Sequence, residues 1–223
     1  MTSPDTASAD EEERIRMATL ILGLRGMGIS DRRLLKAIET IPRAFFVDET
    51  YRERAYDDRS IPVACGQTIS PPSVVAAVVS ALEVGDRHSV LEIGTGSGYQ
   101  AAILSRLARR VTTIERYRTL VKAAEERWLR LRISNVTAIV ADGMLGWPRQ
   151  APFDRIAVNV AFGGAPTKLI GQLSETGILV APIGPAGGPQ RLTLFQRSGD
   201  RVETRDLGPA RFQPPETGIA HNL

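Results

Sequence analysis

The chain has 223 residues, of which 43% are hydrophobic and 24% are charged, and its formal net charge is +3. This composition is typical of a folded globular protein and excludes a chain that is disordered as a whole. Because there is one cysteine, an intramolecular disulfide and a cysteine metal cluster are both excluded, and we expect no metal site.

The charge pattern and the first residues indicate the kind of partner and compartment. The arginines stand in short groups at helical spacing, which favours solvated helix faces over a nucleic-acid-binding surface. Met1 to Glu13 is polar and acidic, unlike a signal peptide, and no apolar run approaches the ~20 residues of a membrane span. We therefore expect a cytoplasmic protein that binds neither nucleic acid nor membrane.

The first third of the chain is predicted to contain a tail and two helices. Residues 1–12 are expected to form a flexible tail. Apolar residues follow a helical period from Arg14 onward. A second helix is predicted to begin at a cap, either Ser30 or Asp31, and to stop at Pro42.

An irregular segment follows, from Phe45 to Pro72, and contains the string Gln67-Thr68-Ile69-Ser70. Long irregular segments inside compact domains are more often functional than idle. A helix is predicted directly after it, over residues 73–82.

From Ser89 onward, strand and helix patterns alternate along the chain. Strands are predicted over residues 89–93, 111–115, 136–141, 155–160 and 178–183. Helices are predicted over residues 100–108, 120–131 and 166–173. Two last runs, 191–197 and 201–207, indicate an antiparallel hairpin. The prediction is an α/β fold with a doubly wound, mostly parallel, seven-stranded Rossmann-like sheet, a C-terminal antiparallel hairpin and N-terminal helical additions.

A glycine-rich loop joins the first strand of this sheet to the helix that follows it. Three alternate glycines occur in the string Glu92-Ile93-Gly94-Thr95-Gly96-Ser97-Gly98. Glycine permits the tight turn and lets a ligand lie against bare backbone. A dinucleotide fingerprint would place its third glycine at position 99, which is Tyr99. Glu92 before the loop would repel a pyrophosphate and suits a cation instead, and S-adenosylmethionine carries a sulfonium and an ammonium group.

Two further carboxylates follow the next two strands. Glu115 lies 21 residues after Gly94, close to the ~20 expected for a carboxylate that binds a ribose diol. Asp142 and Gly143 close the third strand, where a carboxylate and free backbone can meet an adenine ring. We therefore predict an S-adenosylmethionine site formed by Glu92, Gly94, Thr95, Gly96, Ser97, Gly98, Glu115, Asp142 and Gly143.

The scarcity of histidine bears on the methyl acceptor. His88 stands at the base end of a strand and His221 in the tail, so neither is well placed as a general base. A carboxylate acceptor needs no base, because it is already ionised at neutral pH. Its methylation can rely on in-line positioning. The sequence therefore favours a carboxyl acceptor over a phenol or an amine.

Several strings resemble the signature of protein-L-isoaspartate O-methyltransferases, and the resemblance extends over residues 14–212. They are Pro42-Arg43, Phe46-Val47, Ala55-Tyr56-Asp57-Asp58, Ile61-Pro62, Gly66-Gln67-Thr68-Ile69-Ser70 with Pro72, Glu92 to Tyr99, Ala151-Pro152-Phe153-Asp154, and Gln172-Leu173 before Gly177.

The resemblance implies an enzyme that methylates the free carboxyl group of L-isoaspartyl residues in damaged proteins. The ester then collapses to a succinimide and partly returns to aspartate. By position, Ser70 is the family's active-site serine, Gln67 and Thr68 help to cover the cofactor, and Thr68, Ser70 and Val160 contact the substrate. Ser70 also has a plain alternative role as the cap of the following helix.

Four parts of the chain are expected on this basis. They are the tail (1–12), a helical and active-site-loop subdomain (13–82), the S-adenosylmethionine-binding methyltransferase core (83–212) and a C-terminal tail (213–223).

Two segments depart from the family pattern. Because both resemble parts of the family that line the substrate mouth, the departures affect the identity of the acceptor and not the use of the cofactor. The family usually has Thr-Ala-Ala and prolines after the fourth strand, where this chain has Asn159 to Gly164. It has Arg-Phe-Val-Pro-Leu near the C terminus, where this chain has Arg211-Phe212-Gln213-Pro214-Pro215.

Two other interpretations stay open at the level of sequence. One is an amino methyltransferase acting on nucleic acid or protein, because Asn159 and Phe162 keep the outer spacing of its motif. The other is a non-catalytic binding protein on a methyltransferase scaffold. No feature specifies an interface between subunits, so a monomer is the default expectation.

Overall fold

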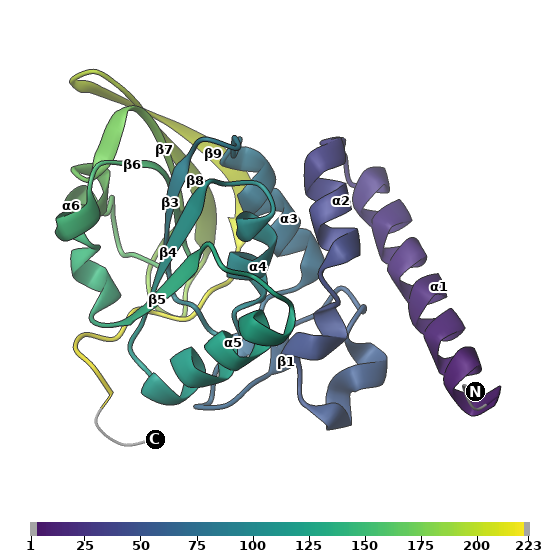
Figure 1. The fold of residues 1–223 in the computed structure, drawn as a ribbon. Helices are drawn as coiled ribbons and strands as arrows, with labels where there is room; N and C mark the ends of the chain where they lie inside the picture. Colours follow the sequence, from purple (N-terminus) through teal and green to yellow (C-terminus); the bar gives the residue numbers. More distant parts are fainter. Residues whose placement is uncertain (1–3, 221–223) are drawn as a thin grey trace.

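Seven strands form one sheet in the computed structural model, which describes residues 4–220 (Figure 1). In chain order they are β3 (Ser89–Ile93), β4 (Arg110–Glu115), β5 (Val136–Val140), β6 (Phe153–Val158), β7 (Leu173–Ile183), β8 (Gln190–Ser198) and β9 (Arg201–Ala210). Their order in the sheet is β5-β4-β3-β6-β7-β8-β9. The strands from β5 to β7 pair in parallel, whereas β8 pairs antiparallel with both β7 and β9. The predicted fold class is confirmed.

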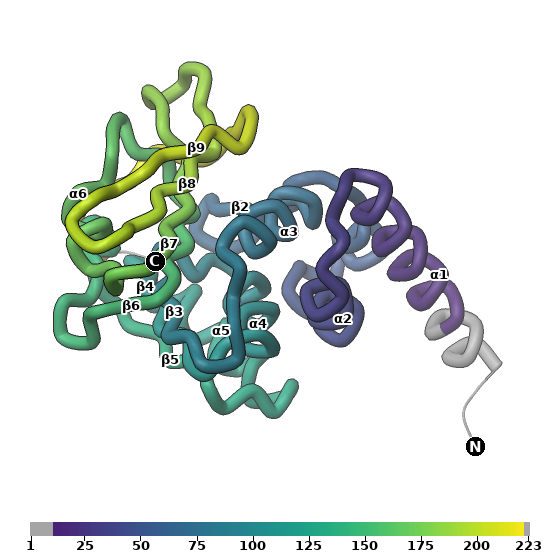
Figure 2. Tube along the Cα trace, turned by 90° about the horizontal axis from the view of Figure 1, so that it is seen from above, coloured from purple at the N-terminus to yellow at the C-terminus, as the bar shows by residue number. Residues whose placement is uncertain are grey.

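Helices cover both faces of the sheet. They are α1 (Pro4–Gly26), α2 (Arg32–Thr40), α3 (Pro72–Ala81), α4 (Tyr99–Ser105), α5 (Arg118–Arg130) and α6 (Thr167–Ile170). Helices α3, α4 and α5 lie on one face and α6 on the other (Figure 1). Seen from above, α1 and α2 lie outside the layer of α3 to α5 (Figure 2).

The remaining elements are short and lie between the larger ones. They are the 3-10 helices η1 (Arg43–Phe46), η2 (Glu49–Arg54), η3 (Gly143–Leu145) and η4 (Pro148–Gln150), and the two-stranded sheet of β1 (Ile61–Pro62) and β2 (Thr68–Ile69). The irregular segment predicted from Phe45 to Pro72 therefore contains a small hairpin, which ends immediately before Ser70.

The first helix differs from its prediction. It begins at Pro4 rather than near Arg14, so residues 4–12, expected to be a tail, have helical backbone. Apart from Pro4 at the first helical position, residues 4–12 contain no proline and no glycine, so nothing in this stretch of sequence breaks the helix. The second helix agrees with its prediction, since the Asp31 carboxylate accepts the backbone N–H groups of Arg33 and Leu34 as an N-cap.

The core has two parts, one on each face of the sheet. Because side chains alternate along a strand, Val90 packs with the helices α1 to α5, while Leu91 and Ile93 pack with α6 on the other face. All three side chains are buried. Strand β3 is therefore covered on both faces, as expected for the central strand of a doubly wound sheet.

The order of the strands reverses at β3. From β3 the chain moves outward to β4 and β5, then returns to β6 on the other side of β3. Ligands of such sheets bind beyond the carboxyl ends of the strands at this switch point. Here Ile93 pairs with Val158, so Gly94 and Asn159 follow side by side.

Among the described residues, no helix is both long enough and apolar enough to cross a membrane.

Candidate active site

A cavity of about 770 Å³ opens at the carboxyl ends of β3, β4 and β6. It is enclosed by residues 67–71, the glycine loop, the ends of β4 and β6, and the segment after β9. Its lining residues are Ser60, 67–71, 74–75, 93–97, 99–100, 114–117, 143–144, 159–160 and 209–216.

The glycine loop forms the floor of this cavity. Gly94, Gly96 and Gly98 all have left-handed backbone, with φ angles of 89°, 52° and 86°. Gly96 has open space where a side chain would be, so a ligand can lie against its backbone. Gly98 is a packing position instead, because a Cβ there would lie 2.8 Å from the Cβ of Ala124. Gly94, Thr95, Gly96 and Ser97 line the cavity, whereas Gly98 does not.

Glu92 does not line the cavity and instead holds the loop from beneath. Its side chain is fully buried and accepts hydrogen bonds from Gln100 (3.0 Å), Asn159 (3.3 Å) and the Thr113 hydroxyl (2.6 Å). The same Thr113 hydroxyl lies 2.7 Å from that of Thr95 in the loop. Burial raises the pKa of Glu92 to about 7, although these hydrogen bonds oppose the shift.

Glu115 lies in the cavity at the end of β4, as predicted. Its Oε2 accepts the N–H of Gly96 at 3.0 Å, and its Oε1 accepts the N–H groups of Arg116 and Tyr117. A carboxylate has about four lone-pair sites, and three are used here, so about one remains for a hydroxyl group of a ligand. Glu115 is therefore bonded to the glycine loop and also offers an acceptor to a ligand in the cavity.

Asp142 and Gly143 take a different arrangement from the predicted one. Asp142 is not among the lining residues, and its oxygens accept the N–H groups of Met144 and Gly218. Gly143 does line the cavity, but a Cβ there would lie 2.6 Å from the Cγ2 of Ile93. The glycine is therefore required by packing against β3, and Asp142 holds the C-terminal segment.

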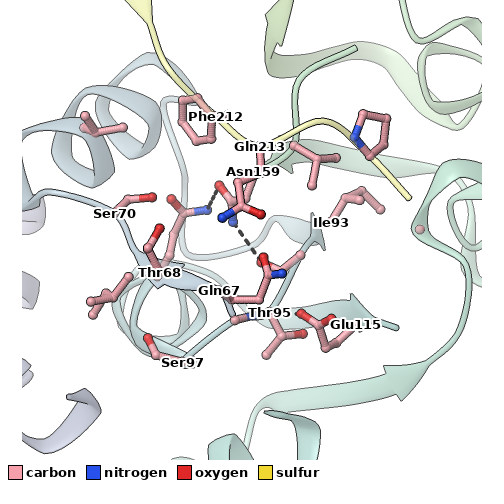
Figure 3. A pocket seen from close by; sticks show the side chains of 18 of the residues that line it. Gln67, Thr68, Ser70, Ile93, Thr95, Ser97, Glu115, Asn159, Phe212 and Gln213 are labelled. Carbon is pink, nitrogen blue, oxygen red and sulfur yellow. Dashed lines mark hydrogen bonds between the residues drawn. The ribbon is translucent and has the colours of Figure 1, made fainter. Parts of the chain in front are cut away.

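The predicted acceptor residues lie on the other side of the cavity. Figure 3 shows Thr68 and Ser70 on one side and Glu115 on the opposite side. Gln67, Thr68, Ser70 and Val160 all line the cavity. The Ser70 hydroxyl makes no hydrogen bond to any described residue, so it is available to a ligand.

Ser70 is not the cap of the helix that follows it. The N-cap of α3 is Pro71, without a side-chain hydrogen bond. The Oδ1 of Asp58 accepts the N–H of Ser73 at 2.9 Å and thus satisfies a donor in the first turn of α3. The alternative role of Ser70 as a helix cap therefore has no support in the structure.

The C-terminal segment closes the cavity from above, at the mouth where the resemblance places it. Phe212 and Gln213 lie over the site beside Asn159 (Figure 3). Gln190 holds this segment: its side-chain amide donates to the carbonyl of Phe212 and accepts the N–H of Phe212. Residues 213–216, expected to belong to a tail, thus line the cavity.

The family model for protein-L-isoaspartate (D-aspartate) O-methyltransferases matches residues 15–218. The chain belongs to this family. A protein-L-isoaspartate O-methyltransferase of Parvibaculum lavamentivorans is 51% identical over 97% of this chain and 98% of the relative. That of Azorhizobium caulinodans is 49% identical over 94% of this chain and 97% of the relative.

Solved structures agree with the family assignment. A protein-L-isoaspartate O-methyltransferase superposes with a TM-score of 0.81 at 29% identity, covering 90% of this chain and 66% of the other. A Plasmodium falciparum protein in complex with S-adenosyl-L-homocysteine gives a TM-score of 0.76 over 89% of this chain and 97% of the other. Its identity of 22% supports the fold alone.

Membership of the protein-L-isoaspartate O-methyltransferase family confirms the resemblance found in the sequence. It also confirms the predicted enzyme class, a methyltransferase that uses S-adenosylmethionine. The sequence departures at Asn159 to Gly164 and Gln213 to Pro215 both lie at the cavity mouth, where Asn159, Val160 and residues 213–215 line it.

Proposed function

We propose that the protein transfers the methyl group of S-adenosylmethionine to the free carboxyl group of L-isoaspartyl residues in damaged proteins. One observation carries this proposal beyond family membership. The free hydroxyl of Ser70 faces the glycine loop across a cavity whose described lining contains no histidine and no lysine. Such a site suits an acceptor that needs orientation rather than deprotonation.

The cavity fits the cofactor in shape and chemistry. The bare backbone at Gly96 offers the close approach that an amino-acid or ribose moiety requires. The carboxylate of Glu115 supplies an acceptor for a ribose hydroxyl group, and Ile93, Ile114 and Met144 form an apolar wall beside it. When bound, S-adenosylmethionine supplies an electrophilic methyl group on a cationic sulfur.

The protein's own contribution to the reaction is positioning. An isoaspartyl carboxylate has an ordinary pKa near 4, so it enters the site as an anion and needs no base. The Ser70 hydroxyl donates a hydrogen bond to one carboxylate oxygen and thereby aims the other at the methyl group. Correct alignment of this kind accounts for much of the rate of two-substrate reactions.

Thr68 and Val160 are proposed to contact the peptide that carries the carboxylate. Thr68 is exposed beside Ser70, and Val160 lies half-buried across the mouth. Glu92 and Asp142, which we first assigned to the cofactor, are proposed to act indirectly: Glu92 supports the glycine loop and Asp142 holds the C-terminal segment.

We further propose a protein or peptide as the acceptor, not a nucleic acid, and a monomer that acts in the cytoplasm. One chain supplies both sides of the cavity, through residues 67–71 and 93–97, so catalysis requires no second copy.

Methyl transfer to three acceptors tests the proposal. The acceptors are an isoaspartyl peptide, its normal aspartyl twin and tRNA, each with radiolabelled cofactor. We expect turnover on the isoaspartyl peptide alone. Turnover on tRNA would show that the acceptor is a nucleic acid. Cofactor binding without turnover on any of the three acceptors would indicate a binding protein.

The pH profile tests the mechanism without a base. His88 precedes β3, where its Nδ1 accepts the N–H of Gly85 at 2.9 Å, and it does not line the cavity. His221 lies outside the described residues. We expect His88→Gln to keep nearly full activity, and the wild-type rate to show no histidine inflection near pH 6.5. Loss of turnover in a folded His88→Gln protein would contradict this mechanism.

A further inference from the structure

Arg43 is a fully buried arginine that the proposed reaction does not use. It is the first residue of η1, and its side chain is 0% exposed. Among the described side chains, no carboxylate forms an ion pair with it. Burial lowers its pKa to about 10, although Tyr99 and Asp58 oppose the shift. Burying a charge without a paired carboxylate costs free energy, so we expect the contacts of Arg43 to serve a function.

Those contacts join three separate parts of the chain. The Nε of Arg43 donates to the carbonyl of Ala55 at 2.7 Å, and its Nη2 donates to the carbonyl of Ser70 at 2.8 Å. The guanidinium carbon lies 5.0 Å from the centre of the Tyr99 ring, in cation–π contact. Tyr99 is the first residue of α4, directly after the glycine loop, and it lines the cavity.

Few groups other than Arg43 anchor the backbone at Ser70. Two prolines follow Ser70, and neither has an N–H group that could anchor the turn. The strand before it, β2, has two residues. The hydrogen bond from Nη2 therefore fixes the carbonyl of the residue whose hydroxyl faces the cavity.

We propose that Arg43 is a positioning residue that sets the Ser70 hydroxyl at the right distance from the glycine loop. One planar guanidinium bonds the Ser70 backbone and stacks on Tyr99, so the acceptor side and the cofactor side are held by the same group. The two carbonyls and the Tyr99 side chain hold the guanidinium in place, and among the described residues neither its Nη1 nor the Tyr99 hydroxyl makes a hydrogen bond elsewhere. This inference rests on the proposed function, because Ser70 must orient the acceptor for its position to matter.

Arg43→Lys is the decisive variant, since lysine keeps the charge and cannot bridge two carbonyls in the fixed fork geometry of a guanidinium. We expect kcat on an isoaspartyl peptide to fall ~10-fold to ~100-fold, because small misplacements of reacting groups lower the rate by such factors. We expect the Kd of S-adenosylhomocysteine, measured by calorimetry, to change by less than about threefold. Arg155→Lys is the matched control. Arg155 is also a buried arginine that donates to two carbonyls, those of Glu83 and Asp154, but it lies away from the cavity.

A double-mutant cycle separates positioning from simple stabilisation. If Arg43 acts through Ser70, Arg43→Lys with Ser70→Ala costs less in kcat than the sum of the two single changes. Arg155→Lys, by contrast, lowers the melting temperature and leaves kcat unchanged. Unchanged kcat in folded Arg43→Lys, or full additivity with Ser70→Ala, overturns the inference while leaving the proposed function intact.

Unchanged kcat in Ser70→Ala overturns the proposed role of Ser70, and the inference with it. If Arg43→Lys does not fold, Arg43→Gln takes its place in the same measurements, because it keeps a donor and removes the buried charge. Failure of both variants to fold assigns Arg43 to structure alone and overturns the positioning role.

Discussion

The cofactor side of the cavity is built around one contiguous segment, to which the end of β4 adds Glu115, whereas the acceptor side is assembled from distant segments. Strand β3, the glycine loop and α4 follow one another, and the buried Glu92 network supports them from below. Ser70 and Phe212 come from opposite ends of the chain, and single polar side chains, Arg43 and Gln190, hold their backbones. Substitutions on the cofactor side should therefore affect binding or folding, whereas those on the acceptor side should affect turnover or peptide binding.

The largest expected effect is on the acceptor side, at Ser70. Ser70→Ala should lower kcat on an isoaspartyl peptide ~100-fold, because a misaligned carboxylate loses in-line attack. Cofactor affinity and melting temperature should stay close to wild type, since Asp58 and not Ser70 bonds the first turn of α3. Single-turnover methylation, calorimetry and thermal melts on one preparation check this. A destabilised and fully active variant would return Ser70 to the role of a helix cap.

The next effect is on the folding of the cofactor side and concerns Glu92. Its pKa of about 7 in the folded protein exceeds the usual 4.5, so the folded state favours the protonated form. The contribution of Glu92 to the free energy of unfolding should therefore be fully present below about pH 4.5 and should fall as pH rises towards 7, by about 2–3 kcal/mol between pH 5 and 8. Glu92→Gln, which cannot ionise, should lose this part of the pH dependence. Urea unfolding of both proteins at pH 5 and 8 measures this change. An equal change in the free energy of unfolding in both proteins would contradict the prediction.

A smaller effect on the cofactor side is expected at Glu115. Glu115→Gln should weaken S-adenosylmethionine binding ~10-fold, or about 1.4 kcal/mol, because an amide replaces a charged acceptor. Calorimetry measures the change, with the exposed Glu125→Gln on α5 as a matched control. Unchanged affinity in a folded Glu115→Gln protein would remove Glu115 from the cofactor site.

The smallest effect is expected where the C-terminal segment is held. Gln190→Ala should raise the KM for an isoaspartyl peptide about fivefold, equivalent to ~1 kcal/mol for the lost hydrogen bonds to Phe212. The exposed Gln196→Ala on the same strand is the control and should leave KM unchanged. An equal KM in both variants would mean that this segment does not shape the peptide site.

The sequence by itself determined the sheet and the position of the cofactor loop. The short, mostly apolar run before the glycine loop located β3 at Ser89–Ile93, because a buried strand that runs into glycines carries its signal locally. The alternation of strands and helices then implied a parallel sheet, and the parallel sheet placed the strand ends, with Glu115 among them, at one edge. Family motifs located Ser70 in the same local way.

Only the tertiary structure decided which polar side chains face the cavity. Glu92 and Asp142 stand in the predicted places along the chain, yet one turns beneath the loop and the other bonds Gly218. The roof of residues 211–216 and the Arg43 contact to Ser70 join positions that are far apart in sequence. No local period records such contacts, because side-chain hydrogen bonds between distant segments depend on how the packed layers meet.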